Sequence, residues 1–197
     1  MINNLKKIKV IAFDFWGVFA DLEHPMYGYI KKHGVDPEKY SESIHDYIIA
    51  HDLGEITEKE FLQKVSDIIG LGLPYKKCHL IFKKETVNRQ LIKVVEKLKN
   101  KFRIFLLTNN PKEYCQIYLF DTGLDKLFDD IIISCQVKYR KPAKEIYEVL
   151  IKKANVKPSE ILFIDDDASK FSTAEKLGIK TLRYFKGRTD RLLESLI

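Results

Sequence analysis

The residues of this chain with the clearest chemical potential are polar side chains that follow short apolar runs. They are, in chain order, Asp14, Thr108 with Asn109, Lys141, and Asp165 with Asp166. Carboxylates can attack an electrophile or bind a hard cation, hydroxyl and amide groups can form hydrogen bonds, and lysine can offset negative charge. What these residues can do together depends on whether the fold brings them to one place.

The apolar runs that precede these residues are predicted to be strands of a parallel sheet. They cover residues 8–13, 102–107, 131–133 and 161–164, and a further run lies at 181–184. Short runs rich in β-branched and aromatic residues are typical of strands buried on both faces. Helical patterns lie between them, at residues 91–98, 146–154 and 174–177. This alternation of strand and helix predicts an α/β fold with a doubly wound parallel sheet.

The strand ends explain how residues distant in sequence could act together. In a parallel sheet the carboxyl ends of the strands meet at one edge, so the polar residues that follow them should become neighbours. Like charges about 4 Å apart repel by roughly 1 kcal/mol even in water. A bound Mg²⁺ would remove this conflict between Asp14, Asp165 and Asp166, because it prefers hard oxygen ligands. The sequence therefore predicts Mg²⁺ as a cofactor.

One long segment, residues 22–84, interrupts the alternation of strands and helices. It contains two predicted helices, at 40–53 and 57–69, and no convincing strand. The second helix opens with Thr57 and has Glu60 three residues later, which is the pattern of a capping box. A helical insertion after the first strand would lie over the edge where open α/β sheets bind ligands. The predicted domains are an α/β core of residues 1–21 and 85–197 and a helical cap of residues 22–84.

Composition excludes several other classes of protein. The formal net charge is +6, but the lysines are dispersed rather than gathered in one stripe with aromatic residues, so no nucleic-acid partner is expected. No apolar run approaches the roughly 18 residues of a membrane span. The N-terminus lacks the pattern of a secretory signal, so we expect a cytoplasmic protein. Cys78, Cys115 and Cys135 are widely spaced and are predicted to be free thiols.

The order and context of these motifs resemble the haloacid-dehalogenase-like superfamily of hydrolases. The resemblance covers nearly the whole chain and is strongest at residues 10–19, 106–110, 140–142 and 161–181. Within the superfamily, the chain is most similar to small sugar-phosphate phosphatases with a helical cap, such as bacterial α-glucose-1-phosphate phosphatases, and residues 54–61 share that likeness. The resemblance implies a Rossmann-like core, a helical cap, and a hydrolase that depends on Mg²⁺.

The resemblance also implies a role for each candidate residue. Asp14 would be the nucleophile that takes the phosphoryl group as an aspartyl-phosphate. Thr108 and Asn109, with the backbone around them, would bind the transferring phosphate. Lys141 would offset the negative charge of the nucleophile and of the phosphate. The Mg²⁺ ligands that the resemblance implies are Asp14, Asp166 and the backbone carbonyl of Trp16, with Asp165 as a further ligand or as support for one.

Trp16 is the main departure from the pattern of the superfamily. Phosphatases of this superfamily usually carry aspartate two residues after the nucleophile, where it protonates the leaving alcohol. An indole cannot exchange a proton near neutral pH, although the Trp16 side chain could still contact substrate. Loss of general acid–base help costs roughly 10²–10⁴ in rate, so we expect slow turnover. Ser169 and Lys170 occupy a stretch where relatives often have Asn or Asp, and the sequence leaves their role open.

The sequence thus predicts a phosphatase for a small phosphorylated metabolite, and two alternatives remain. Trp16 would also fit a non-catalytic or regulatory protein that binds phosphate. A 2-haloacid dehalogenase also lacks the second aspartate, but such enzymes need no metal and hold halide with a cap arginine. No arginine precedes Arg89 in this chain, and residues 165–167 would repel a carboxylate substrate. The oligomeric state is left open.

Overall fold

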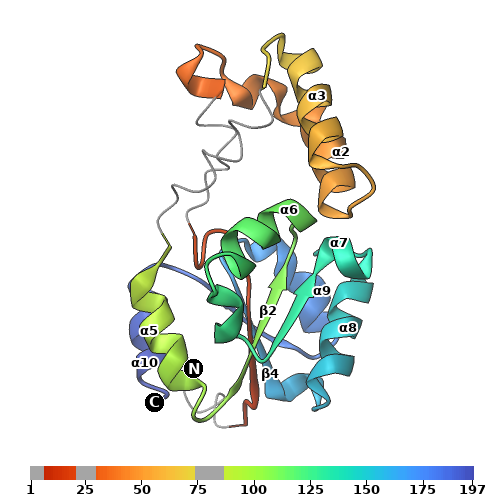
Figure 1. Ribbon diagram of the computed structural model, residues 1–197. Helices are drawn as coiled ribbons and strands as arrows, with labels where there is room; N and C mark the ends of the chain where they lie inside the picture. The colour runs from red at the N-terminus through yellow and green to blue at the C-terminus, as the bar shows by residue number, and fades with distance from the viewer. Residues whose placement is uncertain (1–6, 21–29, 74–86) are drawn as a thin grey trace.

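Five parallel strands form the centre of the larger part of the molecule, in the order β3-β2-β1-β4-β5 (Figure 1). The computed structural model describes residues 7–20, 30–73 and 87–197. The strands are β1 (Val10–Phe13), β2 (Arg103–Thr108), β3 (Asp130–Ile133), β4 (Ile161–Asp165) and β5 (Lys180–Arg183). The predicted α/β fold with a doubly wound parallel sheet is confirmed, because every apolar run forms a strand and all the paired strands are parallel.

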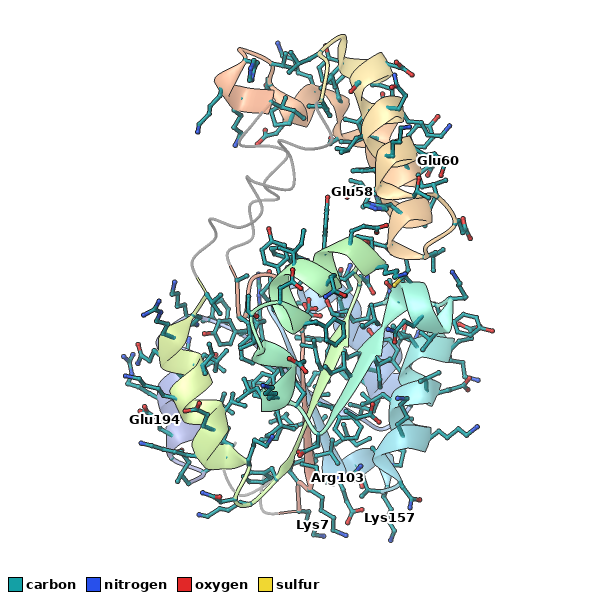
Figure 2. All side chains as sticks on the ribbon, in the orientation of Figure 1. Lys7, Glu58, Glu60, Arg103, Lys157 and Glu194 are labelled. Carbon is teal, nitrogen blue, oxygen red and sulfur yellow. The ribbon has the colours of Figure 1, made fainter. Side chains whose placement is uncertain are left out.

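Helices cover both faces of this sheet. One face carries α5 (Arg89–Leu98) and α10 (Arg188–Glu194), and the other carries α8 (Lys144–Ala154) and α9 (Phe171–Lys176). The short helices of this part are α6 (Lys112–Cys115), η3 (Gln116–Phe120, a π-helical turn), η4 (Leu124–Leu127), α7 (Ser134–Val137), η5 (Pro158–Glu160) and η6 (Ala168–Lys170). The side chains of sheet and helices fill the space between these layers (Figure 2).

The central strand β1 explains why the predicted runs are apolar throughout. All four of its residues are fully buried. Because successive side chains of a strand point to opposite faces, the strand contributes to two cores. Val10 and Ala12 belong to the core on the side of α8, and Ile11 and Phe13 belong to the core on the side of α5. A strand that must be apolar on both faces cannot show the polar alternation of a surface strand.

A separate group of helices, here called the helical segment (residues 30–73), lies beyond the carboxyl ends of the strands (Figure 1). It contains η2 (Pro37–Tyr40), α2 (Ser41–Asp52) and α3 (Glu58–Ile69) and no strand. The predicted capping box of α3 is confirmed, because Thr57 Oγ1 accepts from the Glu60 N–H at 3.2 Å and Glu60 Oε2 accepts from the Thr57 N–H at 2.8 Å. The predicted domain boundaries, at 21/22 and 84/85, lie outside the described residues.

The register of the sheet decides which residues meet at its carboxyl edge. Phe13 of β1 pairs with Ile164 of β4, so the next residues of the two strands, Asp14 and Asp165, lie side by side. Lys7, Arg103 and Lys157 lie at the opposite edge, away from the helical segment (Figure 2). No helix of the described residues is both long and apolar enough to cross a membrane.

Candidate active site

Asp14 is held at the end of β1 by two donors on the same carboxylate oxygen. Its Oδ1 accepts from the Phe15 N–H at 2.7 Å and lies 2.8 Å from Lys141 Nζ. Within residues 7–20, 30–73 and 87–197, no hydrogen bond engages the second oxygen, Oδ2. Burial, against the opposing charge of Lys141, raises the pKa of Asp14 from 3.8 to about 7. The side chain is therefore oriented through one oxygen, while the other remains available.

Lys141 is the buried cation between the two strand ends. Its ammonium lies 2.8 Å from Asp14 Oδ1 and 2.7 Å from Asp165 Oδ2, and the side chain is 1% exposed. Burial disfavours the charge of Lys141, but the two carboxylates outweigh it and raise the pKa of this lysine above its ordinary value. A buried charge is tolerated where opposite charges and hydrogen bonds surround it, and both are present here.

The Asn109 side chain fixes the backbone of Lys141. Asn109 Oδ1 accepts from the Lys141 N–H at 2.8 Å, and Asn109 Nδ2 donates to the Lys141 carbonyl at 3.0 Å. This pair of bonds sets the point from which the lysine side chain reaches Asp14. Asn109 was predicted to bind phosphate. Its side-chain amide is engaged with Lys141, and the residue lines the cavity described below.

Three carboxylates converge in an arrangement suited to a cation. Oxygens of Asp14, Asp165 and Asp166 all lie within 4.8 Å of one another. Burial, and then the charge of Asp165, raise the pKa of Asp166 above its ordinary value. Asp165 uses both of its oxygens within the protein, since Oδ2 contacts Lys141 and Oδ1 accepts from the Asp167 N–H at 2.9 Å. Asp14 and Asp166 are thus better available than Asp165 as ligands.

Gly17 allows the loop after β1 to approach Asp166. The residue has φ +72°, a conformation that favours glycine. A Cβ at this position would lie 2.4 Å from Asp166 Cγ, which is inside van der Waals contact. The glycine is therefore required for the close approach of the backbone at Trp16 and Gly17 to the acidic cluster.

The Trp16 side chain lines the cavity and is fixed by one hydrogen bond. Its Nε1 donates to Asn110 Oδ1 at 2.6 Å, and its ring contacts Tyr118 at a centroid distance of 5.0 Å. Because an indole N–H is only a donor, this bond also orients the Asn110 amide. Asn110 Nδ2 in turn donates to Thr108 Oγ1 at 3.0 Å. Thr108, predicted to contact phosphate, is fully buried behind Asn110 and is not among the residues that line the cavity.

The stretch after the double aspartate forms a local turn. Asp167 accepts from the Ser169 N–H at 2.9 Å and from its hydroxyl at 2.7 Å, and it lies 3.0 Å from Lys170 Nζ. Burial opposes the charge of Asp167, but these hydrogen bonds and the ion pair lower its pKa to about 2. Asp167 thus caps the turn, and Lys170 pairs with Asp167 while also lining the cavity.

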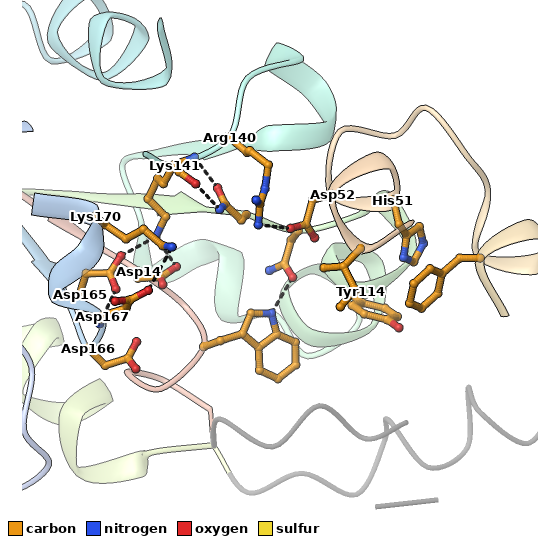
Figure 3. A pocket seen from close by; sticks show the side chains of 15 residues that line it. Asp14, His51, Asp52, Tyr114, Arg140, Lys141, Asp165, Asp166, Asp167 and Lys170 are labelled. Carbon is orange, nitrogen blue, oxygen red and sulfur yellow. Dashed lines mark hydrogen bonds and ion pairs between the residues drawn. The ribbon is translucent and has the colours of Figure 1, made fainter. Parts of the chain in front are cut away.

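A cavity of about 280 Å³ joins these residues to the helical segment (Figure 3). The strand-end carboxylates and Lys141 form one side of it, and α2 and α3 contribute another. The lining residues that sequence reasoning did not select are Ile48, His51, Asp52, Phe61, Asn110, Tyr114, Arg140 and Asp167. Arg140 had one available signal, its place beside Lys141 in the same motif. Asp52 had none, because nothing in the pattern of its helix distinguishes it.

Two of these unselected residues carry an ion pair across the cavity wall. Arg140 Nη2 donates to Asp52 Oδ2 at 3.0 Å. Burial, only partly offset by Arg140, raises the pKa of Asp52 to about 6. The neighbouring His51 is 3% exposed, and burial lowers its pKa to about 4, so this imidazole is neutral at neutral pH. Cys115 and Cys135 are both free and buried, as predicted, whereas Cys78 lies outside the described residues.

Comparison with known proteins agrees with this fold. A sequence profile of the haloacid dehalogenase-like hydrolases matches residues 8–178. The D-ribitol-5-phosphate phosphatase of Bacteroides thetaiotaomicron is 31% identical over 189 residues, which cover 89% of this chain and 91% of that protein. A HAD-like family hydrolase from Porphyromonas gingivalis has a TM-score of 0.75 at 27% identity and covers 95% of this chain and 98% of that one.

A second solved structure agrees in fold. It is a HAD family enzyme from Bacteroides thetaiotaomicron in complex with magnesium and inorganic phosphate, with a TM-score of 0.74 at 22% identity, covering 91% of this chain and 96% of that one. The strand order, the acidic cluster and the buried lysine define a hydrolase with a parallel α/β core. With the profile match over most of its length, the chain belongs to the haloacid dehalogenase-like hydrolase family.

Proposed function

We propose that this chain is a Mg²⁺-dependent phosphatase that hydrolyses a small phosphate monoester through an aspartyl-phosphate at Asp14. The observation that carries the proposal is the Asp14 carboxylate, held through one oxygen by buried Lys141 at the edge of a cavity. The likeness to a phosphatase of a phosphorylated sugar alcohol supports a small phosphorylated metabolite as the substrate. A cavity of about 280 Å³ fits a molecule of that size.

The geometry around Asp14 suits nucleophilic attack on phosphorus. Oδ2 would form the new bond while Oδ1 stays bonded to Phe15 and Lys141. The ammonium of Lys141 would stabilise negative charge on the phosphoryl oxygens without reorganising, because its position is already fixed. The backbone N–H groups of Trp16 and Asn109 donate to no other described residue, so both could bind those oxygens.

The donor set fits Mg²⁺. Asp14 and Asp166 would bind the metal directly together with the Trp16 carbonyl, and Gly17 permits the close approach that this requires. Asp165, with both oxygens engaged, would hold Lys141 and support the cluster rather than serve as the principal ligand. When bound, Mg²⁺ would neutralise charge on the phosphoryl group and on the carboxylates around it.

The helical segment would determine which substrate binds. It would be part of a cap of residues 22–84 over a core of residues 1–21 and 85–197. Ile48, His51, Asp52 and Phe61 reach the cavity from this segment, opposite the nucleophile. This wall carries both apolar and polar groups, and it would bind the part of the substrate beyond the phosphate.

Trp16 makes the proton supply the weak point of the proposed reaction. Position 16 has no group that can protonate a leaving alkoxide. If no other residue supplied that proton, the rate on unactivated esters would be lower by roughly 10²–10⁴. An activated aryl phosphate does not need that proton, so it is the appropriate first substrate. A protein that binds phosphate without turning it over would give no release from this substrate.

The test is release of phosphate from para-nitrophenyl phosphate in the presence of Mg²⁺. Asp14→Asn should abolish it, and excess chelator should do the same, whereas Asp46→Asn, a matched change at an exposed site on α2, should have no effect. Activity that survives Asp14→Asn or chelation would refute the proposal. Halide release from a 2-haloacid, measured in parallel, would instead support the dehalogenase alternative. The cluster of Asp14, Asp165 and Asp166 disfavours that alternative, because it would repel a carboxylate substrate.

A further inference from the structure

The proposed reaction needs a proton donor that position 16 does not supply. When the P–O bond of an alkyl phosphate breaks, the leaving oxygen takes the electron pair and needs a proton at nearly the same time. The donor must face the cavity from the side opposite Asp14, because nucleophile and leaving oxygen lie in line on either side of phosphorus. The inference developed below rests on the proposed function.

Among the described residues, one cavity carboxyl meets these conditions. The carboxyl groups that line the cavity are Asp14, Asp52, Asp165, Asp166 and Asp167. Four of them belong to the acidic cluster or the turn after it. Asp52 alone comes from the helical segment, across the cavity from this group (Figure 3). Glu58 is also buried in the helical segment, but it is not among the residues that line the cavity.

Asp52 is fixed to the core although it belongs to the helical segment. Its carbonyl accepts from Ser134 Oγ at 2.5 Å, and the same hydroxyl oxygen accepts from the Asn110 N–H at 3.0 Å. Lys138 Nζ donates to the carbonyls of the next two residues, Leu53 and Gly54, at 2.9 and 3.2 Å. These bonds hold the end of α2 beside the site, so Asp52 keeps its position relative to the strand ends.

The Asp52 carboxyl is oriented through one oxygen and leaves the other available. Oδ2 accepts from Arg140, and no side chain of the described residues bonds Oδ1. This is the arrangement that a proton donor needs, since one oxygen fixes the group and the other can carry the proton. Arg140 would also stabilise the carboxylate that remains after the proton has left.

We propose that Asp52 is the general acid of this enzyme and that it replaces the aspartate absent at position 16. In the first step Asp14 Oδ2 bonds to phosphorus, the P–O bond to the leaving group breaks, and the Asp52 proton moves to the leaving oxygen to give the free alcohol. In the second step the Asp52 carboxylate takes a proton from water as that water attacks the aspartyl-phosphate. The P–O bond to Asp14 then breaks, and inorganic phosphate and the free Asp14 carboxylate are formed.

The charges around Asp52 are compatible with this role. Burial favours its protonated form, and Arg140, Lys141 and Lys170 favour the charged form, with a resulting pKa of about 6. His51, beside it on α2, is neutral, and the thiols of Cys115 and Cys135 remain protonated because burial raises the pKa of both. A group whose two forms are balanced in this way can both give and regain a proton near neutral pH.

The experiment compares two phosphate esters of similar size with Mg²⁺ present. Benzyl phosphate has a poor leaving group that needs a proton, and para-nitrophenyl phosphate has a good one that does not. Asp52→Asn should lower kcat/KM for benzyl phosphate by roughly 10²–10⁴ and for para-nitrophenyl phosphate by less than about tenfold. Asp46→Asn should leave both values unchanged. Adding Trp16→Asp to Asp52→Asn should restore hydrolysis of benzyl phosphate.

A second variant separates proton donation from a structural role. Arg140→Gln breaks the ion pair that Asp52 makes but keeps the carboxyl, so the ratio of the two kcat/KM values should stay near that of the unaltered protein. An equal fall on both substrates with Asp52→Asn, or the same change of ratio with Arg140→Gln, would overturn the role of Asp52. If the unaltered protein hydrolyses neither ester, the proposed function fails and this inference fails with it.

Discussion

Replacing Lys141 with methionine would test how the site balances its buried charges. The Lys141 ammonium lies 2.8 Å from Asp14 and 2.7 Å from Asp165, and both carboxylates have little access to solvent. Methionine fills similar space without charge, so the variant leaves two buried carboxylates without their cation. Breaking a buried ion pair by removing one partner costs about 3–5 kcal/mol, and we expect a loss of this size in the free energy of unfolding at about pH 8, with chelator present.

The loss should depend on pH in one direction. In the folded protein the pKa of Asp14 is raised from 3.8 to about 7, so its contribution to stability is present below 3.8 and is lost as the pH rises through about 7. Without Lys141 this pKa rises further, because the main opposing charge is gone. The difference between the two proteins should therefore be smaller at about pH 4, where Asp14 is protonated, and largest above about pH 7.

Urea unfolding followed by circular dichroism measures this difference. Lys144→Met is the matched control, because Lys144 makes an exposed ion pair with Glu148 at 2.6 Å, with side chains 61% and 48% exposed. Exposed pairs of this kind contribute little to the free energy of unfolding, because solvent screens their charges. If Lys141→Met cost no more than the control, or if its cost did not change between acid and neutral pH, the reasoning about the buried charges would be wrong. Addition of Mg²⁺ should recover part of the lost free energy of unfolding, since the bound metal ion replaces the missing Lys141 ammonium.

Two further substitutions test the loop after β1. Gly17→Ala should weaken binding of Mg²⁺, measured by calorimetry, because its Cβ would lie 2.4 Å from Asp166 Cγ at a φ of +72°. Gly70→Ala is the control for the backbone angle φ alone, since Gly70 has φ +66° and open space around it. Equal Mg²⁺ affinity in the two variants would contradict the steric argument. In the Asp52→Asn variant, Trp16→Asp should raise kcat on unactivated sugar phosphates, measured as released phosphate, by restoring an acid where relatives usually have one. Turnover that stays the same or falls would mean that Trp16 is more than a missing acid, and its hydrogen bond to Asn110 would then be the first contact to examine.

The elements of the fold were predictable because their causes are local. A strand that is buried on both faces must be apolar at every position, and β1 and β4 are buried throughout. The capping box at Thr57 and Glu60 depends on two residues three positions apart, so the sequence contains all of the information needed.

The positions of the site residues were only partly predictable. Parallel register brings Asp14 beside Asp165, and this follows from the strands alone. The sequence did not reveal that the Asn109 side-chain amide hydrogen-bonds the Lys141 backbone. That contact joins two loops whose residues are 32 positions apart in the chain. Nor did the sequence reveal that the Asn110 amide hydrogen-bonds the Thr108 hydroxyl, because the indole of Trp16 sets the orientation of the Asn110 amide.

The sequence by itself determined the family, the parallel sheet, and the group of carboxylates and lysine at its edge, because strand ends in such a sheet have one place to meet. Only the tertiary structure decided what faces that group across the cavity. Asp52 and Arg140 lie 88 positions apart, and neither belongs to a pattern that requires the other. Their contact exists because the end of α2 is bonded to α7, and such a contact between separate elements is set by packing and not by local sequence.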